Sequence, residues 1–338
     1  DASNVALWLA AVRNFRAAVE VIYVMPDGRV EQVPLARLLL RDQIAHQAQA
    51  LLDHYDYSAL AALLAADTRW GNTWRPHLVH AMAERLHFNF QGAQEALDRA
   101  LARAEGEPRA WIGRLRDEVE RLRRVLEQAP SPPHSGDEDP AWRPWLEKQR
   151  TGLAELYWNL AVKARRAEWV DFLGRLFRLL EGLLRLIFEQ ETRHSTEPDK
   201  AGNFKDFASY VHSNPELVSY LHSQNVQIPN ALEGWAPNIR VLSATLKYWV
   251  CEQSQARLGP AYGVVRAVQE LATLRNKSII AHGWKEVSRE EIEQAAKLST
   301  DELLARIREG LRAAGVPIER GDPYGQVNAW LRDQLKAD

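Results

Sequence analysis

Apolar residues recur every three or four positions along most of the chain from Leu35 onward. This spacing puts them on one face of a helix, so it predicts a series of amphipathic α-helices. The pattern before Leu35 is different. A β-branched run at 19–24, the turn signal Pro26–Gly28 and the alternating residues 29–33 predict a strand, a turn and a second strand. We therefore expect a mainly α fold that begins with a small α/β fragment.

A proline-rich segment divides the helical part of the chain. Residues 129–146 contain five prolines together with Ser135, Gly136 and several acids, a composition typical of a linker. We therefore predict four regions. In chain order they are the α/β fragment at 1–34, a helical middle domain at 35–128, the linker at 129–146, and a helical domain at 147–338.

Two further patterns predict particular helices in the last region. One apolar stripe is wider than a solitary surface helix needs, so its helix should be buried in a bundle or at a subunit interface. The stripe consists of Leu176, Leu179, Leu180, Leu183, Leu184 and Ile187. Farther along, Ser288 is followed three residues later by Glu291, a capping box that predicts the start of a helix.

Composition narrows the classes of function. Of the 338 residues, 46% are hydrophobic and 26% are charged, as in an ordinary globular protein. No apolar run approaches the roughly 20 residues that span a bilayer. The single cysteine, Cys251, excludes an intrachain disulfide framework, and we expect it to be a small buried apolar residue of a cytoplasmic protein. Because the net charge is −2, any nucleic acid would need a local basic site.

The segment LRNKSIIAHGW at 274–284 carries the candidate chemistry. Arg275 and His282 are seven positions apart, and seven steps of about 100° come within about 20° of two full turns. We therefore predict a helix over 262–281 that presents both side chains on one face, with Gly283 as the C-cap. This arrangement would place the imidazole near a helix end, at the rim of a cleft.

These residue types suit RNA cleavage by internal attack of the 2′-hydroxyl. Histidine can take up or release a proton near neutral pH. Arginine matches the charge and geometry of phosphate oxygens in the transition state. Asn276 can orient either partner by hydrogen bonding. This chemistry requires neither metal nor cofactor, and no cluster of Asp, Glu and His shows convincing metal-ligand spacing, so we expect a reaction without either.

Arg275-Asn276 followed by His282 resembles the HEPN signature, and the wording LRNKSIIAHG is similar to the ribonuclease helix of the CARF–HEPN effectors of type III CRISPR systems. The resemblance implies a homodimer in which two HEPN domains line one composite site. It also implies metal-independent cleavage of single-stranded RNA to a 2′,3′-cyclic phosphate, in antiviral defence. It gives catalytic roles to Arg275, Asn276 and His282, and Lys277 and Trp284 are candidate RNA-binding residues beside them.

The N-terminal fragment bears on regulation. In the CARF–HEPN family, the CARF domain senses cyclic oligoadenylate and needs a complete α/β sheet. Residues 1–34 offer at most the edge of a CARF-like domain, whereas 35–128 look like the middle helical region of some of these effectors. A cyclic oligoadenylate activator is therefore expected only if a complete CARF domain lies upstream.

Other matches to the loose motif are less persuasive. Arg41 with His46 and Arg75 with His80 also fit it, but a spacing of five puts two side chains about 140° apart on a helix. Neither pair is followed by a glycine cap. The histidines at 77, 80 and 87 have Glu84 as the one acidic neighbour at helical spacing, so we interpret them as packing or surface residues rather than metal ligands.

Two other functions remain open at this point. A HEPN toxin of a toxin–antitoxin pair would use the same chemistry with a different partner, although the large region before the linker argues mildly against it. A non-catalytic helical scaffold would use the HEPN bundle for dimerisation and the helices of 35–128 for binding. Loss of RNA cleavage on removal of Arg275 or His282 would separate the enzyme from the scaffold.

Overall fold

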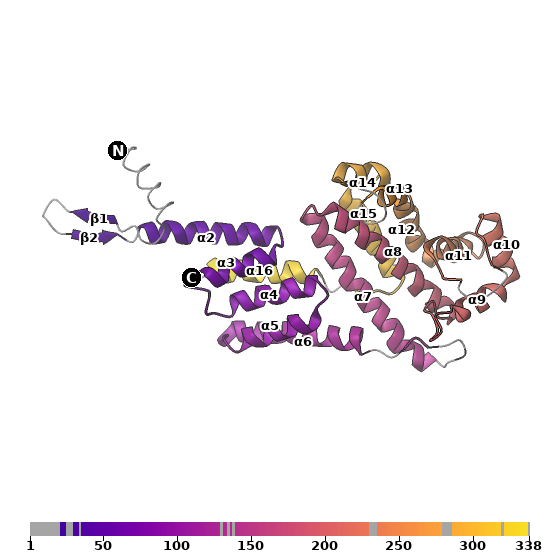
Figure 1. Ribbon diagram of the computed structural model, residues 1–338, viewed down its shortest axis with the longest axis horizontal. Coiled ribbons are helices and arrows are strands. Elements are labelled where there is room, and N and C mark those ends of the chain that lie inside the picture. Colours follow the sequence, from indigo (N-terminus) through magenta and orange to yellow (C-terminus); the bar gives the residue numbers. More distant parts are fainter. Residues whose placement is uncertain are drawn as a thin grey trace. The chain divides into compact units, whose positions relative to one another are not determined.

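The computed structural model describes residues 21–24, 30–33, 35–128, 131–133, 136, 139–229, 235–278, 286–318 and 321–336, and they are mainly helical, which confirms the predicted fold class (Figure 1). Strands β1 (Val21–Val24) and β2 (Val30–Val33) pair antiparallel, with Val21 opposite Val33. The helical residues form two compact units, 1–113 with 325–338, and 114–324. The four regions predicted from the sequence divide the chain differently and stay a prediction.

The first unit is a set of helical hairpins joined by a helix from the far end of the chain. It contains α2 (Leu35–Asp53), α3 (Tyr57–Ala66), α4 (Arg75–Leu86), α5 (Phe90–Leu101) and the start of α6 (Gly106–Glu127). The side chains of Asp56 and Asn89 cap α3 and α5, respectively, by accepting hydrogen bonds from backbone N–H groups. The apolar faces of these helices meet in the core, where Leu60, Leu78 and Leu97 have no exposed surface.

Helix α16 (Pro323–Lys336) packs into this first unit although it ends the chain. The buried Asn328 accepts a hydrogen bond from the Tyr57 hydroxyl and donates one to the Leu52 carbonyl, both at 2.7 Å. The Trp330 ring stacks on Trp111 with a centroid distance of 4.2 Å and an interplanar angle of 1°. Aromatic stacking and paired buried polar groups therefore hold the C-terminal helix here.

The second unit is a bundle built around one long helix. It contains α7 (Asp139–Arg165), α8 (Trp169–Thr192), α9 (Lys205–His212), α10 (Pro215–Ser223), α11 (Ile239–Cys251), the 3₁₀ turn η2 (Ala256–Leu258), α12 (Gly259–Gln269), α13 (Ala272–Lys277), α14 (Arg289–Ala296) and α15 (Thr300–Ala313). Helix α8 contacts α7, α11 and α12, and α15 covers α12 and α7. Helix α14 begins at Arg289 with the predicted capping box of Ser288 and Glu291, which is confirmed.

The leucine stripe of α8 lies inside this bundle. Its six residues are at most 2% exposed within a single chain, because α7, α11 and α12 already cover them. The prediction that the stripe is buried in a bundle is therefore confirmed, and the alternative that it lies at a subunit interface is wrong. A dimer of this chain would have to use another surface.

At two other places the local structure differs from what the sequence suggested. The second half of the predicted linker, 139–146, forms the first turns of α7, with Pro144 inside the helix. Burial of Trp142, Trp145 and Leu146 offsets the helix-breaking tendency of proline there. Cys251 is exposed, because α11 buries Tyr248 and Trp249 and ends at the cysteine.

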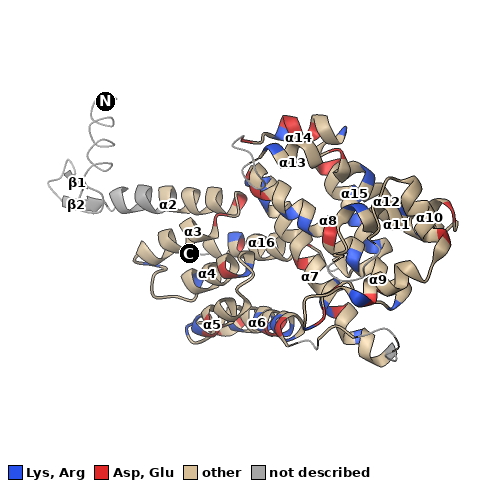
Figure 2. Cartoon of the chain, turned by 45° about the vertical axis from the view of Figure 1, so that its right-hand side comes forward, with Lys and Arg blue, Asp and Glu red and all other residues tan. Residues whose placement is uncertain are grey.

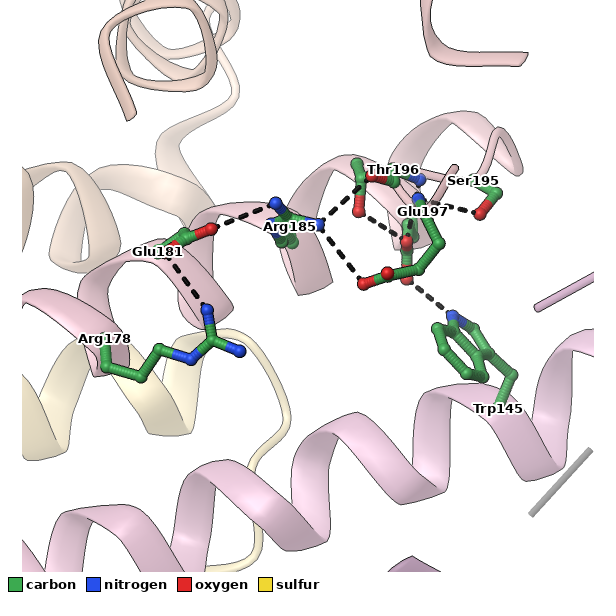
Figure 3. A network of polar contacts seen from close by, with 8 residues as sticks. Trp145, Arg178, Glu181, Arg185, Ser195, Thr196 and Glu197 are labelled. Carbon is green, nitrogen blue, oxygen red and sulfur yellow. Dashed lines mark hydrogen bonds and ion pairs between the residues drawn. The ribbon is translucent and has the colours of Figure 1, made fainter. Parts of the chain in front are cut away.

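A network of polar contacts ties α8 to its surroundings at its C-terminal half (Figure 3). The fully buried Glu189 accepts hydrogen bonds from Trp145 Nε1 of α7 at 2.7 Å and from Thr196 N and Oγ1 at 2.9 and 2.6 Å. Burial raises the pKa of this carboxyl group, while its three donors act in the opposite direction. Arg185 donates to the Thr196 carbonyl and to Glu197 in the same loop. Helix α8 is therefore fixed to α7 and to the loop that follows it.

Candidate active site

The motif segment does not form the single long helix predicted over 262–281. Helix α12 ends at Gln269, α13 spans Ala272–Lys277, and Ser278 has an extended backbone with φ −82° and ψ 163°. The Ser278 hydroxyl donates to the Arg275 carbonyl at 2.7 Å, which occupies a backbone acceptor that a longer helix would use. The prediction of one continuous helix over 262–281 is therefore wrong, because α12 and α13 are separate helices and α13 ends at Lys277.

Arg275 lies on α13 with its guanidinium over an aromatic ring of α8. Its Cζ is 4.9 Å from the centroid of the Phe177 ring, within the range of a cation–π interaction. Phe177 is 6% exposed, whereas Arg275 is half-buried. The Nε atom of Arg275 is buried and has no hydrogen-bond partner among the described residues. No described carboxylate forms an ion pair with this guanidinium, so its positive charge is not neutralised by the part of the chain described.

The other predicted site residues divide into two groups. Asn276 and Lys277 follow Arg275 on α13 and are both exposed. His282 and Trp284 lie outside the described residues, so their roles stay predictions. The structure thus brings together Arg275, Asn276 and Lys277 at the C-terminal end of one short helix.

Phe177 is the residue of this site that the sequence did not indicate. It lies within the apolar stripe of α8, where the sequence pattern predicts only an ordinary core residue. Only the packing of α13 relative to α8 shows that one face of its ring meets a guanidinium. Periodicity within α8 could not have revealed a partner on another helix.

The two competing arginine–histidine pairs have other environments. Arg75 is buried, donates to the Gln334 carbonyl at 3.1 Å and lies over the Trp74 ring, so it is a structural arginine of the first unit. His80 is exposed and lies 3.5 Å from Glu84 one turn along α4. The side chain of Arg41 is outside the described set. Within the described parts of the chain, no three His, Cys, Asp or Glu side chains are grouped so as to hold a metal ion.

Elsewhere in the described part of the chain, basic side chains are spread over many helices. Figure 2 shows lysine and arginine on most helices, interspersed with aspartate and glutamate. Many of these cations are paired with acids, as Arg185 is with Glu181. Arg275, whose guanidinium has no acidic partner among the described residues, and Lys277 two residues later form a local basic site that could take a phosphate. No described helix is both long enough and apolar enough to cross a bilayer.

Comparison with known proteins identifies the family to which the chain belongs. A family model for the Cas_Csm6 HEPN domain matches residues 138–332, more than half of the chain and all of the 274–284 motif. Among solved structures, the chain resembles Enterococcus italicus Csm6 bound to cyclic hexa-2′-fluoro-hexa-dAMP, with a TM-score of 0.51 and 16% identity. That match covers 92% of this chain and 60% of the other, so the present chain spans about three fifths of that protein. A search of curated proteins gave no match. The predicted HEPN family is thus confirmed, and the chain belongs to the Cas_Csm6 HEPN domain family.

Proposed function

We propose that this chain is an endoribonuclease of type III CRISPR antiviral defence that cleaves single-stranded RNA without metal. The observation that carries the proposal is the family match, which includes the whole Arg275–His282 motif. The geometry of Arg275 supports it, because a half-buried guanidinium without a described acidic partner suits a phosphate.

In the proposed reaction, the RNA 2′-oxygen forms a bond to phosphorus and the bond from phosphorus to the 5′-oxygen breaks. The products are a 2′,3′-cyclic phosphate and a free 5′-hydroxyl. His282 moves the proton, either from the 2′-hydroxyl or to the leaving oxygen. Arg275 stabilises the negative charge that gathers on the phosphate oxygens, and the exposed amide of Asn276 orients the phosphate or a partner side chain.

We propose that two copies of the chain form the complete site, each contributing its Arg–His pair. The apolar stripe of α8 is not the contact, since it is covered within one chain. Lys277 and Trp284 are proposed to bind RNA beside the motif, Lys277 as an exposed cation near the phosphates. The related Enterococcus italicus protein was solved with a cyclic oligonucleotide. By analogy, cyclic oligoadenylate would activate a form of this chain that has a complete CARF domain.

Cleavage of labelled single-stranded RNA in the presence of EDTA tests the proposal. Wild-type protein should cut, and Arg275→Ala and His282→Ala should each lose at least about a hundredfold in rate. Mass spectrometry of the products should show 2′,3′-cyclic phosphate ends. Arg69→Ala is a matched control, because this arginine pairs with Asp67 in the first unit. Undiminished cutting by both motif variants would overturn the assignment, and an inactive wild type with a stable dimer would favour the scaffold.

A further inference from the structure

We propose that Phe177 is a positioning residue that holds the Arg275 guanidinium in its working orientation through a cation–π contact. The inference rests on the proposed function, since it concerns how the phosphate-binding arginine is presented. Phe177 itself would touch neither RNA nor the reacting atoms.

Among the described residues, Arg275 has few other constraints. It is carried by a six-residue helix with extended backbone immediately after Lys277. Its backbone N–H bonds to the Leu271 carbonyl at 2.9 Å, but its side chain makes no hydrogen bond or ion pair with the described residues. An arginine side chain has several rotatable bonds, so without a contact it would sample many orientations. The ring of Phe177, 4.9 Å from Cζ, is the contact that restricts it.

Phe177 is itself immobilised. It is 6% exposed on α8, where the neighbouring stripe residues Leu176 and Leu180 are fully buried. The hydrogen bonds of Glu189 to Trp145 and Thr196 fix the same helix to α7 and to the following loop (Figure 3). The ring is therefore a rigid platform, which is the kind of support that a catalytic group needs.

One edge of the Arg275 guanidinium is left to face RNA. The Phe177 ring lies against the guanidinium, and the buried Nε cannot reach a solvent-exposed ligand. The edge formed by the two terminal nitrogens, Nη1 and Nη2, is left for the phosphate. We infer that Arg275 binds phosphate end-on through this pair, which lysine cannot imitate because its ammonium is a point charge.

A series of fluorinated phenylalanines at position 177 tests the contact. Each added fluorine weakens the negative potential of the ring face while changing its shape little, so the cation–π attraction decreases stepwise. Going from phenylalanine to trifluorophenylalanine should lower kcat about three- to tenfold, in even steps, with KM for RNA little changed. A purely structural role would leave kcat flat across the series, because apolar volume is preserved.

The same series at Phe172 is the matched control. Phe172 is fully buried on the same helix, and its ring meets the Trp169 ring rather than a guanidinium. Fluorination there should leave kcat unchanged. An equal loss at both positions would mean that fluorine disturbs α8 itself, and the positioning role of Phe177 would then be rejected.

A second measurement does not depend on catalysis. In protein labelled with ¹⁵N-arginine, the ring current of Phe177 should shift the Arg275 Nε–Hε signal, which is assigned by its absence in Arg275→Lys. Phe177→Leu removes the ring current and should therefore move this signal. If the wild type does not cut RNA, the proposed function fails while the signal still tests the stack. If the wild type cuts but both the fluorine series and the signal are unresponsive, only the positioning role fails.

Discussion

Replacing Glu189 by glutamine should destabilise the second unit because one hydrogen bond to the side chain is lost. The carboxyl group accepts from Thr196 with one oxygen and from Trp145 Nε1 with the other. Glutamine can keep the Thr196 contacts with its carbonyl oxygen, but its amide N–H₂ then faces the indole N–H, donor to donor. Two buried donors without an acceptor cost about 2 kcal/mol. Alanine removes all three contacts and leaves a small cavity, so Glu189→Ala should cost about 4 kcal/mol.

The pH dependence gives a second signature. Burial raises the pKa of Glu189 above its usual value of 4.5. The neutral Glu189 carboxyl group therefore makes its full contribution to the free energy of unfolding below about pH 4.5. This contribution is lost as pH rises through the pKa of the group in the folded state. Glutamine does not titrate. The difference in unfolding free energy between wild type and Glu189→Gln should consequently be larger at pH 4.5 than at pH 8.

Urea unfolding followed by hydrogen–deuterium exchange in the peptides spanning 189–204 measures this unit separately. Glu147→Gln, an exposed carboxyl replacement on α7, is the control and should change stability by less than about 0.5 kcal/mol. The reasoning would be refuted by a Glu189→Gln protein as stable as wild type at pH 4.5. It would also be refuted if the difference between the two proteins widened as pH rose.

Three further outcomes are expected. Arg275→Lys should keep the charge but lose at least about tenfold in RNA cleavage, measured by single-turnover kinetics, because an ammonium has no planar fork. Asn328→Ala should lower the unfolding free energy of the first unit by about 2 kcal/mol in urea titrations, since the Tyr57 hydroxyl and a buried carbonyl lose their partner. Hydrogen bonds from Thr300 and Arg289 lower the pKa of Glu293 to about 2. A ¹³C NMR titration should give that midpoint, and Thr300→Val should raise it.

Each of these three has its own check. If Arg275→Lys cleaves RNA at the wild-type rate, cleavage does not require a bidentate contact. Asp333→Ala, an exposed change on the same helix as Asn328, should be neutral in the urea titration, and an equal loss in both would point to helix α16 as a whole. For Glu293, the sign follows from its lowered pKa: its stabilising contribution is present above pH 4.5 and is lost as pH falls towards 2. A midpoint near 4.5 would show that the hydrogen bonds do not persist in solution.

Local patterns in the sequence were enough for the helical class and for the candidate chemistry. The recurrence of leucine in 176–187 predicted a broad apolar face, and Ser288 with Glu291 predicted a helix start, because both signals act within one or two turns. The motif at 274–284 indicated the family for a similar reason. The residue types that phosphate chemistry needs lie close together in the chain.

Packing between distant segments decided the rest. The stripe of α8 could have faced another subunit, and only the positions of α7, α11 and α12 show that it is core. The ring of Phe177 under Arg275 and the return of α16 to the first unit depend on contacts between segments far apart in sequence. Helical periodicity tells which face of a helix is buried but not what covers it, since many partners can bury the same apolar area. Helix α13 ends at Lys277, where the Ser278 hydroxyl donates to the Arg275 carbonyl, and the seven-residue spacing of Arg275 and His282 could not predict that local contact.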